Sequence, residues 1–317
     1  MGESPLQASV IIATYNRGRV LPHVLGVLDR QTVPPDRYEI VIADDGSTDD
    51  TPQVVAREAA RIRPHVTYLR LEHCGAAAAR NAAIRASRGQ YLVFIDSDII
   101  CSPQFLEEHL RAHERWKNAV VTGPAVLIRS LDEIPRRPRI WDWSAAPFAG
   151  GNASVRRQDA FRVGLFDESF DELGWEDIEF GIRLKQGGLV TCFVPTAVGY
   201  HYKPDPIDPA GVAAYASSQG RMAVRLVRKH PILEARMATG LNPLAMAIDR
   251  LASVFDWDLR LARWILRKTE GQGHFWLRSV AAKQLYNRLY YKAARAALRQ
   301  PDRPARAAES EVRPEST

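Results

Sequence analysis

The chain has 317 residues, 46% of them hydrophobic, which is enough to bury the core of one large domain with an appendage, or of two domains, and excludes global disorder. It has neither the basic patch and apolar run of a signal peptide nor an uncharged apolar stretch of about 18 residues, so no membrane span is predicted. Cys74, Cys101 and Cys192 form no C-x-x-C pair, which argues against a disulfide framework or a zinc knuckle. We therefore expect a cytoplasmic protein.

The formal net charge of +6 is unevenly distributed along the chain. Between Arg221 and Arg299 there are 16 Lys or Arg residues against 5 Asp or Glu residues, a local charge of +11, which leaves −5 for the remainder. This asymmetry predicts two regions with different roles.

Short runs rich in β-branched residues alternate with helical patterns in the first 100 residues. The strands are predicted at 9–13, 38–43, 66–71 and 91–95, and the helices at 17–31, from about 49, and at 76–86. Such alternation requires right-handed crossovers and predicts an α/β fold with a mainly parallel sheet flanked by helices. Open sheets of this kind bind ligands beyond the carboxyl ends of their strands.

Polar residues follow the predicted strands at that edge of the sheet. The first strand is followed by Thr14-Tyr15-Asn16-Arg17, and the second by the acidic run that contains Asp44 and Asp45. Each motif alone is also typical of a turn, with Gly46 supplying a positive φ. Their convergence on one edge is harder to explain as turns alone.

Asp96-Ser97-Asp98 directly follows the apolar run Tyr91–Ile95. If the extended geometry continues, residues i and i+2 face the same way, so the two carboxylates lean toward one point. Oxygen ligands suit a hard cation such as Mg²⁺ or Mn²⁺, and such a cation can hold a diphosphate. The motif therefore predicts a divalent-cation site.

Three further places carry side chains suited to binding or catalysis. Arg80 lies one turn into a helix that opens with small residues, where it could contact a base or a phosphate, or could simply be exposed. Glu176 and Asp177 begin a helix beside Trp175; they are candidates for a general base, although acids are also favoured there by the helix dipole. His201 ends a predicted strand pair, 190–194 with 197–199, and a lone histidine is most often structural unless a metal is nearby.

With these residues in order, the chain resembles the inverting glycosyltransferases of family 2, whose catalytic domain has the nucleotide-diphospho-sugar transferase fold, GT-A. The resemblance covers about residues 9–202. It rests on Thr14–Arg17, Asp44–Ser47, Ala79–Asn81 and Asp96–Asp98. The stretch from Gly150 to Asp177 also resembles the acceptor half shared by β-1,4-galactosyltransferases and bacterial chondroitin-type polymerases.

The resemblance implies a nucleotide-diphospho-sugar donor, with UDP favoured and GDP or dTDP left open. It implies that Thr14, Asp45 and Arg80 hold the nucleobase. The other residues on the nucleotide side of the implied donor site are Tyr15, Asn16 and Ser97.

The implied cofactor is Mn²⁺ or Mg²⁺. By resemblance, Asp98 ligates the metal directly, Asp96 contacts the ribose and the metal shell, and His201 completes the metal site. Gly151 and Asn152 are implied to line the donor sugar.

Asp177 is implied to be the general base, with Trp175 and Glu176 shaping the acceptor and sugar pocket. An inverting displacement needs a carboxylate near the attacking hydroxyl and a cation that neutralises the departing diphosphate on the opposite side. The acceptor is expected to carry a hydroxyl, and lipid-linked, glycan, peptide and small-molecule acceptors all stay open, as does the sugar.

Three regions are predicted: a GT-A catalytic domain at 1–204, a helical extension at 205–300 and a disordered tail at 301–317. The extension reads as basic amphipathic helices, either packed on the sheet domain or attached peripherally to an anionic membrane at its inner face. Nucleic acid is disfavoured because no binding motif accompanies the charge.

Other functions fit the sequence less well. A sugar nucleotidyltransferase should carry a Gly-rich loop after the first strand, which is absent. A catalytically inactive nucleotide-sugar-binding or scaffold protein of a polysaccharide assembly would not need the intact Asp98, Asp177 and His201. His109 and His113 have zinc-protease spacing but lack the Glu that should follow the first histidine.

Overall fold

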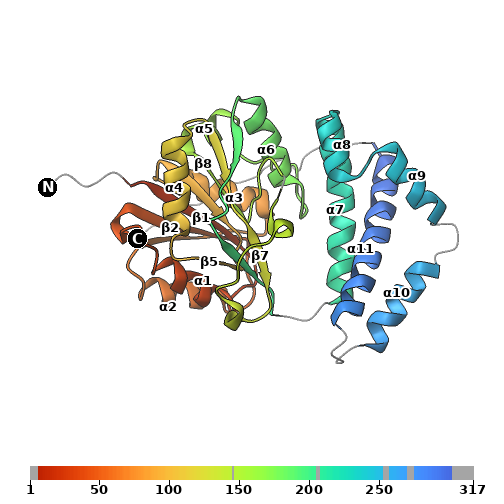
Figure 1. The fold of residues 1–317 in the computed structure, drawn as a ribbon, viewed down its shortest axis with the longest axis horizontal. Helices are drawn as coiled ribbons and strands as arrows, with labels where there is room; N and C mark the ends of the chain where they lie inside the picture. The colour runs from red at the N-terminus through yellow and green to blue at the C-terminus, as the bar shows by residue number, and fades with distance from the viewer. Residues whose placement is uncertain (1–5, 145, 205–207, 253–256, 270–274, 302–317) are drawn as a thin grey trace.

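A computed structural model describes residues 6–301, apart from 145, 205–207, 253–256 and 270–274. A mixed α/β domain lies on one side of the molecule and a group of helices on the other (Figure 1). The predicted tail at 301–317 falls, except for Pro301, outside the described residues.

The main sheet of the described chain has seven strands in the order β3-β2-β1-β4-β8-β6-β9. Their bounds are β1 Ala8–Thr14, β2 Tyr38–Asp44, β3 His65–Arg70, β4 Tyr91–Ile95, β6 Ala119–Thr122, β8 Asn152–Arg156 and β9 Val190–Phe193. β1 pairs in parallel with both β2 and β4, while β8 runs antiparallel between β4 and β6. The predicted, mainly parallel sheet is confirmed.

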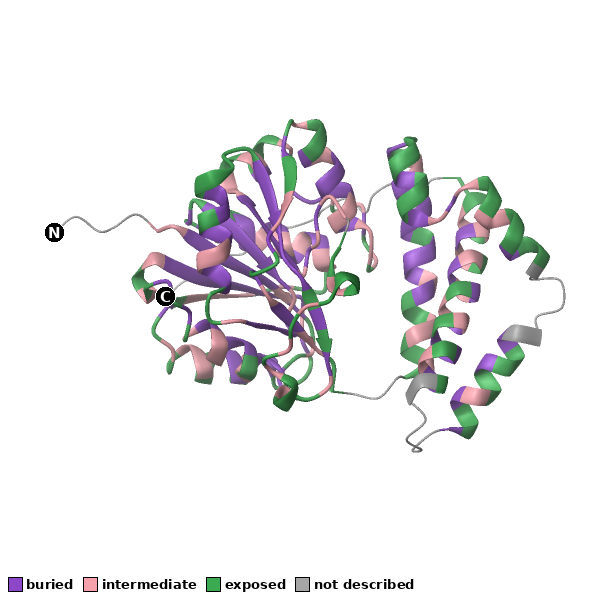
Figure 2. Cartoon of the chain, viewed as in Figure 1, coloured by how far each residue is buried: buried purple, intermediate pink, exposed green. Residues whose placement is uncertain are grey.

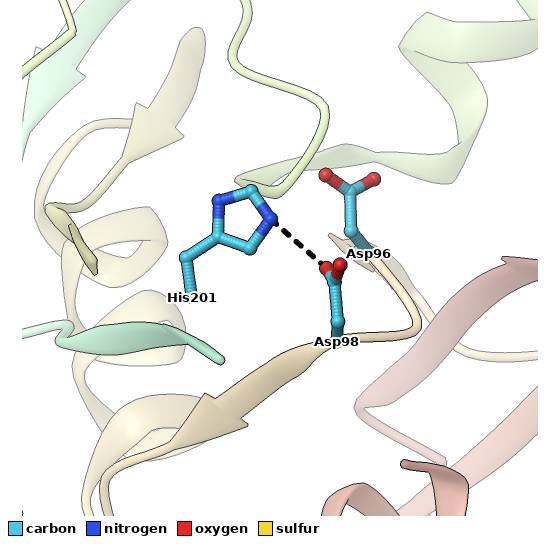
Figure 3. Close-up of side chains that lie close together, drawn as sticks. All are labelled: Asp96, Asp98 and His201. Atoms are coloured by element: carbon cyan, nitrogen blue, oxygen red, sulfur yellow. Dashed lines mark ion pairs between the residues drawn. The ribbon is translucent and has the colours of Figure 1, made fainter. Parts of the chain in front are cut away.

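A smaller three-stranded sheet, in the order β5-β10-β7, lies beside the main one. It consists of β5 Ile99–Cys101, β7 Ala125–Ile128 and β10 Gly199–Tyr202. The predicted pairing of 190–194 with 197–199 is wrong, because β9 adds to β6 in the main sheet whereas β10 pairs with β5 and β7. β-branched runs identify strands but not their partners. This arrangement brings His201, on β10, to the turn that follows β4 (Figure 3).

Helices cover both faces of the main sheet, and its central strands are buried on both sides (Figure 2). One face packs α1 Leu21–Leu28, α2 Thr51–Ala59 and α4 Phe105–Arg115; the other packs α3 Ala76–Ala86, α5 Arg157–Arg162 and α6 Glu176–Gln186. Val10 and Ile12 join the first core and Ile11 the second, as the two-residue period requires.

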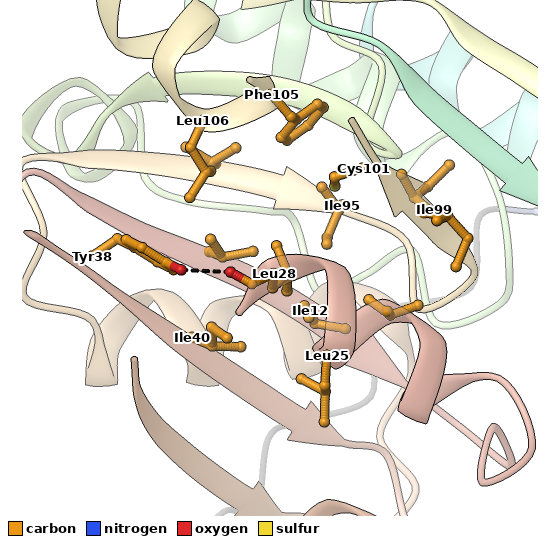
Figure 4. Close-up of a cluster of buried hydrophobic side chains, with 14 of the residues drawn as sticks. Ile12, Leu25, Leu28, Tyr38, Ile40, Ile95, Ile99, Cys101, Phe105 and Leu106 are labelled. Atoms are coloured by element: carbon orange, nitrogen blue, oxygen red, sulfur yellow. Dashed lines mark hydrogen bonds between the residues drawn. The ribbon is translucent and has the colours of Figure 1, made fainter. Parts of the chain in front are cut away.

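The first core includes one specific polar contact. Tyr38 is almost fully buried, and its hydroxyl donates a hydrogen bond of 2.5 Å to the backbone oxygen of Leu28 (Figure 4). This bond ties the end of α1 to the start of β2. The helix itself is shorter than the predicted 17–31, because residues 17–20 form a turn on the Arg17 carbonyl before it begins.

The C-terminal region is helical, as predicted. Its helices are α7 Pro209–Lys229, α8 Leu233–Thr239, α9 Pro243–Ala252, α10 Trp257–Lys268 and α11 Phe275–Leu298. α7 and α11 lie side by side along their length (Figure 1). They approach closely at Gly220, where a Cβ would come within 2.3 Å of the Tyr290 carbonyl oxygen. Within the described residues, no helix combines the length and the apolar character needed to cross a membrane.

Candidate active site

Asp96, Asp98 and His201 meet at the carboxyl end of β4. One ligand atom from each lies within 4.8 Å of the others, and His201 Nε2 is 3.0 Å from Asp98 Oδ1 (Figure 3). The meeting follows from strand pairing: His201 pairs with Ile99, the residue after Asp98, across the antiparallel β5 and β10. The structure therefore brings together the three residues predicted to hold a metal.

Positive groups surround Asp98. Lys203 Nζ lies 3.4 Å and an Arg17 guanidinium nitrogen 3.9 Å from Asp98 Oδ2. Burial would raise the pKa of Asp98, but the hydrogen bond and charge of His201, with the charges of Lys203 and Arg17, lower this pKa to about 2. The carboxylate is ionised at neutral pH. Lys203 was not among the predicted site residues, although its position two residues beyond His201 is a usable signal.

The donor set fits a divalent cation. Two carboxylates supply the hard oxygen ligands that Mg²⁺ and Mn²⁺ prefer, and one imidazole is a ligand that many divalent metals share. Asp96 is only partly buried, so it still faces the solvent side from which a ligand would enter.

Asp177 lies in the first turn of α6, across from this triad. Its Oδ1 accepts a hydrogen bond from its neighbour Ile178 N at 2.7 Å, and its Oδ2 accepts a long one from Gly150 N at 3.4 Å. Burial, followed by the negative charge of Glu176, raises the pKa of Asp177 to about 7, against the opposing charge of Arg80. A carboxylate that titrates near neutral pH is suited to take up a proton.

Arg80 joins the two halves of the site. Its guanidinium lies 2.7 Å from Glu176 Oε1 and 3.4 Å from Asp96 Oδ1, and it sits over the Phe166 ring at 5.5 Å. The Arg80 guanidinium is therefore already engaged by protein groups from both sides of the site.

The loop before β8 passes close to both groups of carboxylates. A Cβ on Gly151 would come within 2.7 Å of Asp96 Oδ2, and one on Gly150 within 3.3 Å of the Asp177 Cβ. A side chain at either position would press on Asp96 or Asp177, so the two glycines let the loop pass close to both carboxylates.

The residues after β1 divide into two groups. Thr14 is buried, and its hydroxyl has no hydrogen-bond partner within the described part of the chain; Tyr15 is 45% exposed and leans on the His73 ring at 4.9 Å. Asn16 instead accepts backbone hydrogen bonds from Thr48 and Asp49 and so connects two loops. Tyr15 is exposed to a ligand and the Thr14 hydroxyl has no partner in the described chain, whereas the Asn16 side chain is used structurally.

The acidic pair after β2 has a similar division. Asp44 accepts hydrogen bonds from Ser47 N and the Tyr68 hydroxyl, which makes it a turn residue. Asp45 accepts from Cys74 N at 2.6 Å and Gly75 N at 3.0 Å, where α3 is about to start. Any nucleobase contact by Asp45 would share a carboxylate that already orders this loop.

Asn152 supports the site from behind. Its Nδ2 donates to the carbonyls of Pro124 and Ala197, each at 2.9 Å, and its Oδ1 lies 3.0 Å from His109 Nε2. His109 and His113 both contact Ser154 Oγ at 2.8 Å. The two histidines are thus buried structural residues, and Ser97 is likewise buried beside the triad.

Trp175 and Glu176 are also held by the protein. Trp175 has a left-handed φ of 71°, and its Nε1 donates to the Gln219 carbonyl of α7 at 2.9 Å. Glu176 accepts from Gly174 N in addition to Arg80. The loop that precedes Asp177 is therefore positioned by the helical extension.

Solved structures with similar folds define the class. A mannosyltransferase from Pyrobaculum calidifontis in complex with GDP-Man and Mn²⁺ matches with a TM-score of 0.63 and 22% identity, over 92% of this chain and 87% of that chain. S. aureus TarS 1-349 in complex with UDP-GlcNAc matches with a TM-score of 0.56 and 17% identity, over 92% and 91% of the two chains. The fold is that of the GT-A glycosyltransferases, as expected.

Sequence relatives narrow the assignment. The family model described as Glycosyl transferase family 2 matches residues 9–167. Validoxylamine A glucosyltransferase of Streptomyces hygroscopicus subsp. limoneus is 31% identical over 270 residues, 71% of this chain and 57% of that protein. Chondroitin synthase of Escherichia coli is 27% identical over 240 residues, 62% of this chain and 34% of that protein. The chain thus spans from a third to under two thirds of the length of these relatives.

The chain belongs to glycosyl transferase family 2.

Proposed function

We propose that the enzyme transfers a sugar with inversion from a nucleotide-diphospho-sugar, with UDP as the nucleotide, to a hydroxyl acceptor, with the help of a divalent cation. The observation that carries this proposal is the arrangement of one site with Asp96, Asp98 and His201 on one side and Asp177, whose pKa is near neutral, on the other. Arg80 connects the two sides.

In the proposed reaction, Asp177 accepts the proton of the acceptor hydroxyl. The acceptor oxygen forms a bond to the anomeric carbon while the bond from that carbon to the diphosphate oxygen breaks on the opposite face. When bound at Asp96, Asp98 and His201, Mn²⁺ or Mg²⁺ supplies positive charge that offsets the charge of the leaving diphosphate. Lys203 and Arg17, beside Asp98, add positive charge at the same place.

Other residues have proposed supporting roles. Thr14 and Tyr15 contact the nucleobase, Asp45 contributes through the loop it orders, and Arg80 orients Asp96 and Glu176. Gly151 leaves room for the donor sugar. The polar side-chain atoms of Asn152, Trp175 and Glu176 are hydrogen-bonded within the protein, so these residues support the site and do not bind the donor through them.

A donor screen tests the proposal. Unfolding temperature is measured for the full chain with a panel of UDP-, GDP- and dTDP-sugars, each with Mn²⁺ and with a chelator. A ligand that binds only the folded state raises the unfolding temperature, so we expect a rise with UDP-sugars that depends on Mn²⁺. A panel without any Mn²⁺-dependent rise would contradict the proposal.

Nucleotide release separates an enzyme from the inactive binding or scaffold protein. An active enzyme releases UDP from its donor slowly even without an acceptor, whereas a binding protein shows the thermal shift but no turnover. Proton NMR of the transferred sugar then tests inversion at the anomeric carbon.

A second proposal concerns peripheral attachment to an anionic membrane surface. On α9, Leu244, Ile248 and Leu251 are 70%, 60% and 75% exposed and recur at helical spacing. On α10, the exposed face carries Trp264 at 54% exposure among basic residues. The exposed basic residues of α10 are Arg260, Arg263, Arg267 and Lys268. Apolar and basic side chains on one surface are typical of helices that bind anionic lipid.

Vesicle sedimentation tests this attachment with vesicles of equal parts phosphatidylglycerol and phosphatidylcholine. We expect the full chain to sediment, and the triple variant Leu244→Ser, Ile248→Ser, Leu251→Ser to remain in the supernatant. Val190→Ser, which changes an exposed apolar residue of β9, is the control. Equal sedimentation of the triple variant and the wild type would contradict attachment through α9.

A further inference from the structure

Helix α7 is fixed against the loop that leads into Asp177. Ser218 Oγ donates to the Leu173 carbonyl at 2.7 Å, and the Gln219 carbonyl accepts from Trp175 Nε1 at 2.9 Å. A Cβ on Gly174 would lie 2.0 Å from the Gln219 side chain, so helix and loop are in direct contact. The extension therefore forms part of the surroundings of the base.

Tyr215 lies on this same face of α7. It precedes Ser218 by three residues and Gln219 by four, spacings that place side chains next to each other on a helix. Trp175, the residue that α7 contacts, is two residues from Asp177. Tyr215 therefore lies about one helical turn before the residues of α7 that contact the loop leading into α6.

The Tyr215 ring is available to a ligand although it lies close to the site. It remains 48% exposed, and the ring of Tyr286, from α11, lies 6.0 Å away between centroids. Burial and Tyr286 raise the pKa of Tyr215, and the charges of Asp177, Glu176 and Asp96 raise it further. The hydroxyl is therefore within electrostatic range of carboxylates from both sides of the site.

We propose that Tyr215, backed by Tyr286, is an acceptor subsite that takes a neutral pyranose-like ring and presents its hydroxyl to Asp177. An exposed tyrosine offers a flat apolar face for the C–H groups of such a ring and a polar edge for its hydroxyls. On the Asp177 side of the site two carboxylates, Glu176 and Asp177, share one guanidinium, that of Arg80, which disfavours an acidic acceptor. The inference rests on the proposed sugar transfer, since it assigns the acceptor side of that reaction.

Saturation-transfer NMR tests the subsite with named probes: methyl β-D-glucopyranoside, methyl β-D-glucopyranosiduronate and the open-chain polyol sorbitol, each with UDP and diamagnetic Mg²⁺. The wild type and Tyr215→Phe should contact the neutral pyranoside in preference to the other two probes. Tyr215→Ala and Tyr215→Leu should bind it about tenfold more weakly, the order expected for loss of one aromatic contact.

Two controls keep the result specific. Trp116→Ala removes another partly exposed aromatic ring, at the end of α4, and should leave pyranoside binding unchanged. Mn²⁺-dependent UDP binding, measured by calorimetry, should be the same in every variant.

The outcomes separate the two proposals. Pyranoside binding that is unaffected in both Tyr215→Ala and Tyr215→Leu, or no pyranoside contact in a wild type that binds UDP, overturns the subsite alone. Failure of the wild type to bind any nucleotide overturns the proposed donor chemistry. In that case the comparison of pyranoside binding between the wild type and the Tyr215 variants still tests the subsite.

Discussion

The sheet domain and the helical extension place their apolar side chains differently. In the sheet domain, Ile12, Ile40 and Val93 are completely buried, whereas on α9 and α10 Leu251 and Trp264 are largely exposed (Figure 2). Apolar burial therefore stabilises the core strands of the sheet domain from both faces, whereas α9 and α10 bury only their inner side and leave apolar side chains on an outer side.

The inner side of the extension is joined to the sheet domain by a buried ionic cluster. Glu179 of α6 is completely buried and contacts Arg183 at 2.7 Å, Lys229 at 2.8 Å and His230 at 3.0 Å. Burial would raise the pKa of Glu179, but hydrogen bonds from these three groups lower it. Because α6 also carries Asp177, the inner side of the extension supports the helix that holds the proposed general base.

The largest expected effect is in the sheet domain itself. Asp177→Asn should reduce sugar transfer on the order of a thousandfold or more while donor binding persists, because the general base is lost. Because burial raises the pKa of Asp177, its ionised form lowers the free energy of unfolding at neutral pH. The uncharged asparagine removes this cost, so the variant should unfold at an equal or higher temperature than the wild type. Transfer within about tenfold of wild type would remove Asp177 from this role.

The metal side should respond in binding rather than in the proton-transfer step. Loss of a residue that only hydrogen-bonds a metal ligand weakens metal affinity by about 10–100-fold. Asp98→Ala removes a proposed direct ligand, so it should weaken Mn²⁺-dependent donor binding by at least about a hundredfold. Calorimetry with UDP and Mn²⁺ measures this effect. Asp36→Ala, in the short helix Pro35–Arg37, is the matched control. Unchanged UDP affinity in Asp98→Ala would contradict metal ligation.

The junction between the regions should respond in stability. Glu179→Gln leaves Arg183, Lys229 and His230 without their buried carboxylate partner and should lower the free energy of unfolding by about 2 kcal/mol in urea titrations. The lowered pKa means that this stabilisation is present above the ordinary glutamate pKa and is lost as pH falls below it, so the difference should shrink in acid.

The control for that junction is Glu107→Gln, which removes a half-exposed partner of Arg111 on α4. Surface pairs contribute little, so its effect should stay within about 0.5 kcal/mol. Equal losses in the two variants would show that the Glu179 cluster does not join the regions.

The smallest effect concerns pH. Transfer should rise as pH increases through the pKa of Asp177, because only the ionised carboxylate accepts a proton. Glu176→Gln removes the neighbouring negative charge and frees Arg80, and both changes lower the pKa of Asp177. The rising limb of the pH–rate profile should therefore move to lower pH. A limb that stays in place would assign the titration to another group.

Much of the catalytic half could be predicted because its signals are local. Strand runs, the Asp96–Asp98 spacing and the small residues at the start of α3 each depend on neighbouring residues, and α3 begins and ends where predicted. Resemblance supplied the roles of His201 and Asp177. The contact of His201 with Asp98 depends on the long-range pairing of β5 with β10.

What the sequence did not show depends on contacts between distant segments. The side-chain oxygen of Asn16 accepts a hydrogen bond from Thr48 N, and that of Asn152 contacts His109 Nε2. Both partners lie many residues away in the sequence, so these contacts could not be predicted from neighbouring residues. The same holds for Lys203, whose place beside Asp98 depends on the pairing of β10 with β5.

The Glu179 cluster also has a consequence for where the catalytic unit ends. A chain stopped at the predicted boundary after residue 204 would lack Lys229 and His230, so two of the three groups around a fully enclosed carboxylate would be missing. We expect such a fragment to fold poorly even though every proposed metal ligand is present. The minimal self-sufficient piece of this enzyme should instead continue at least through His230.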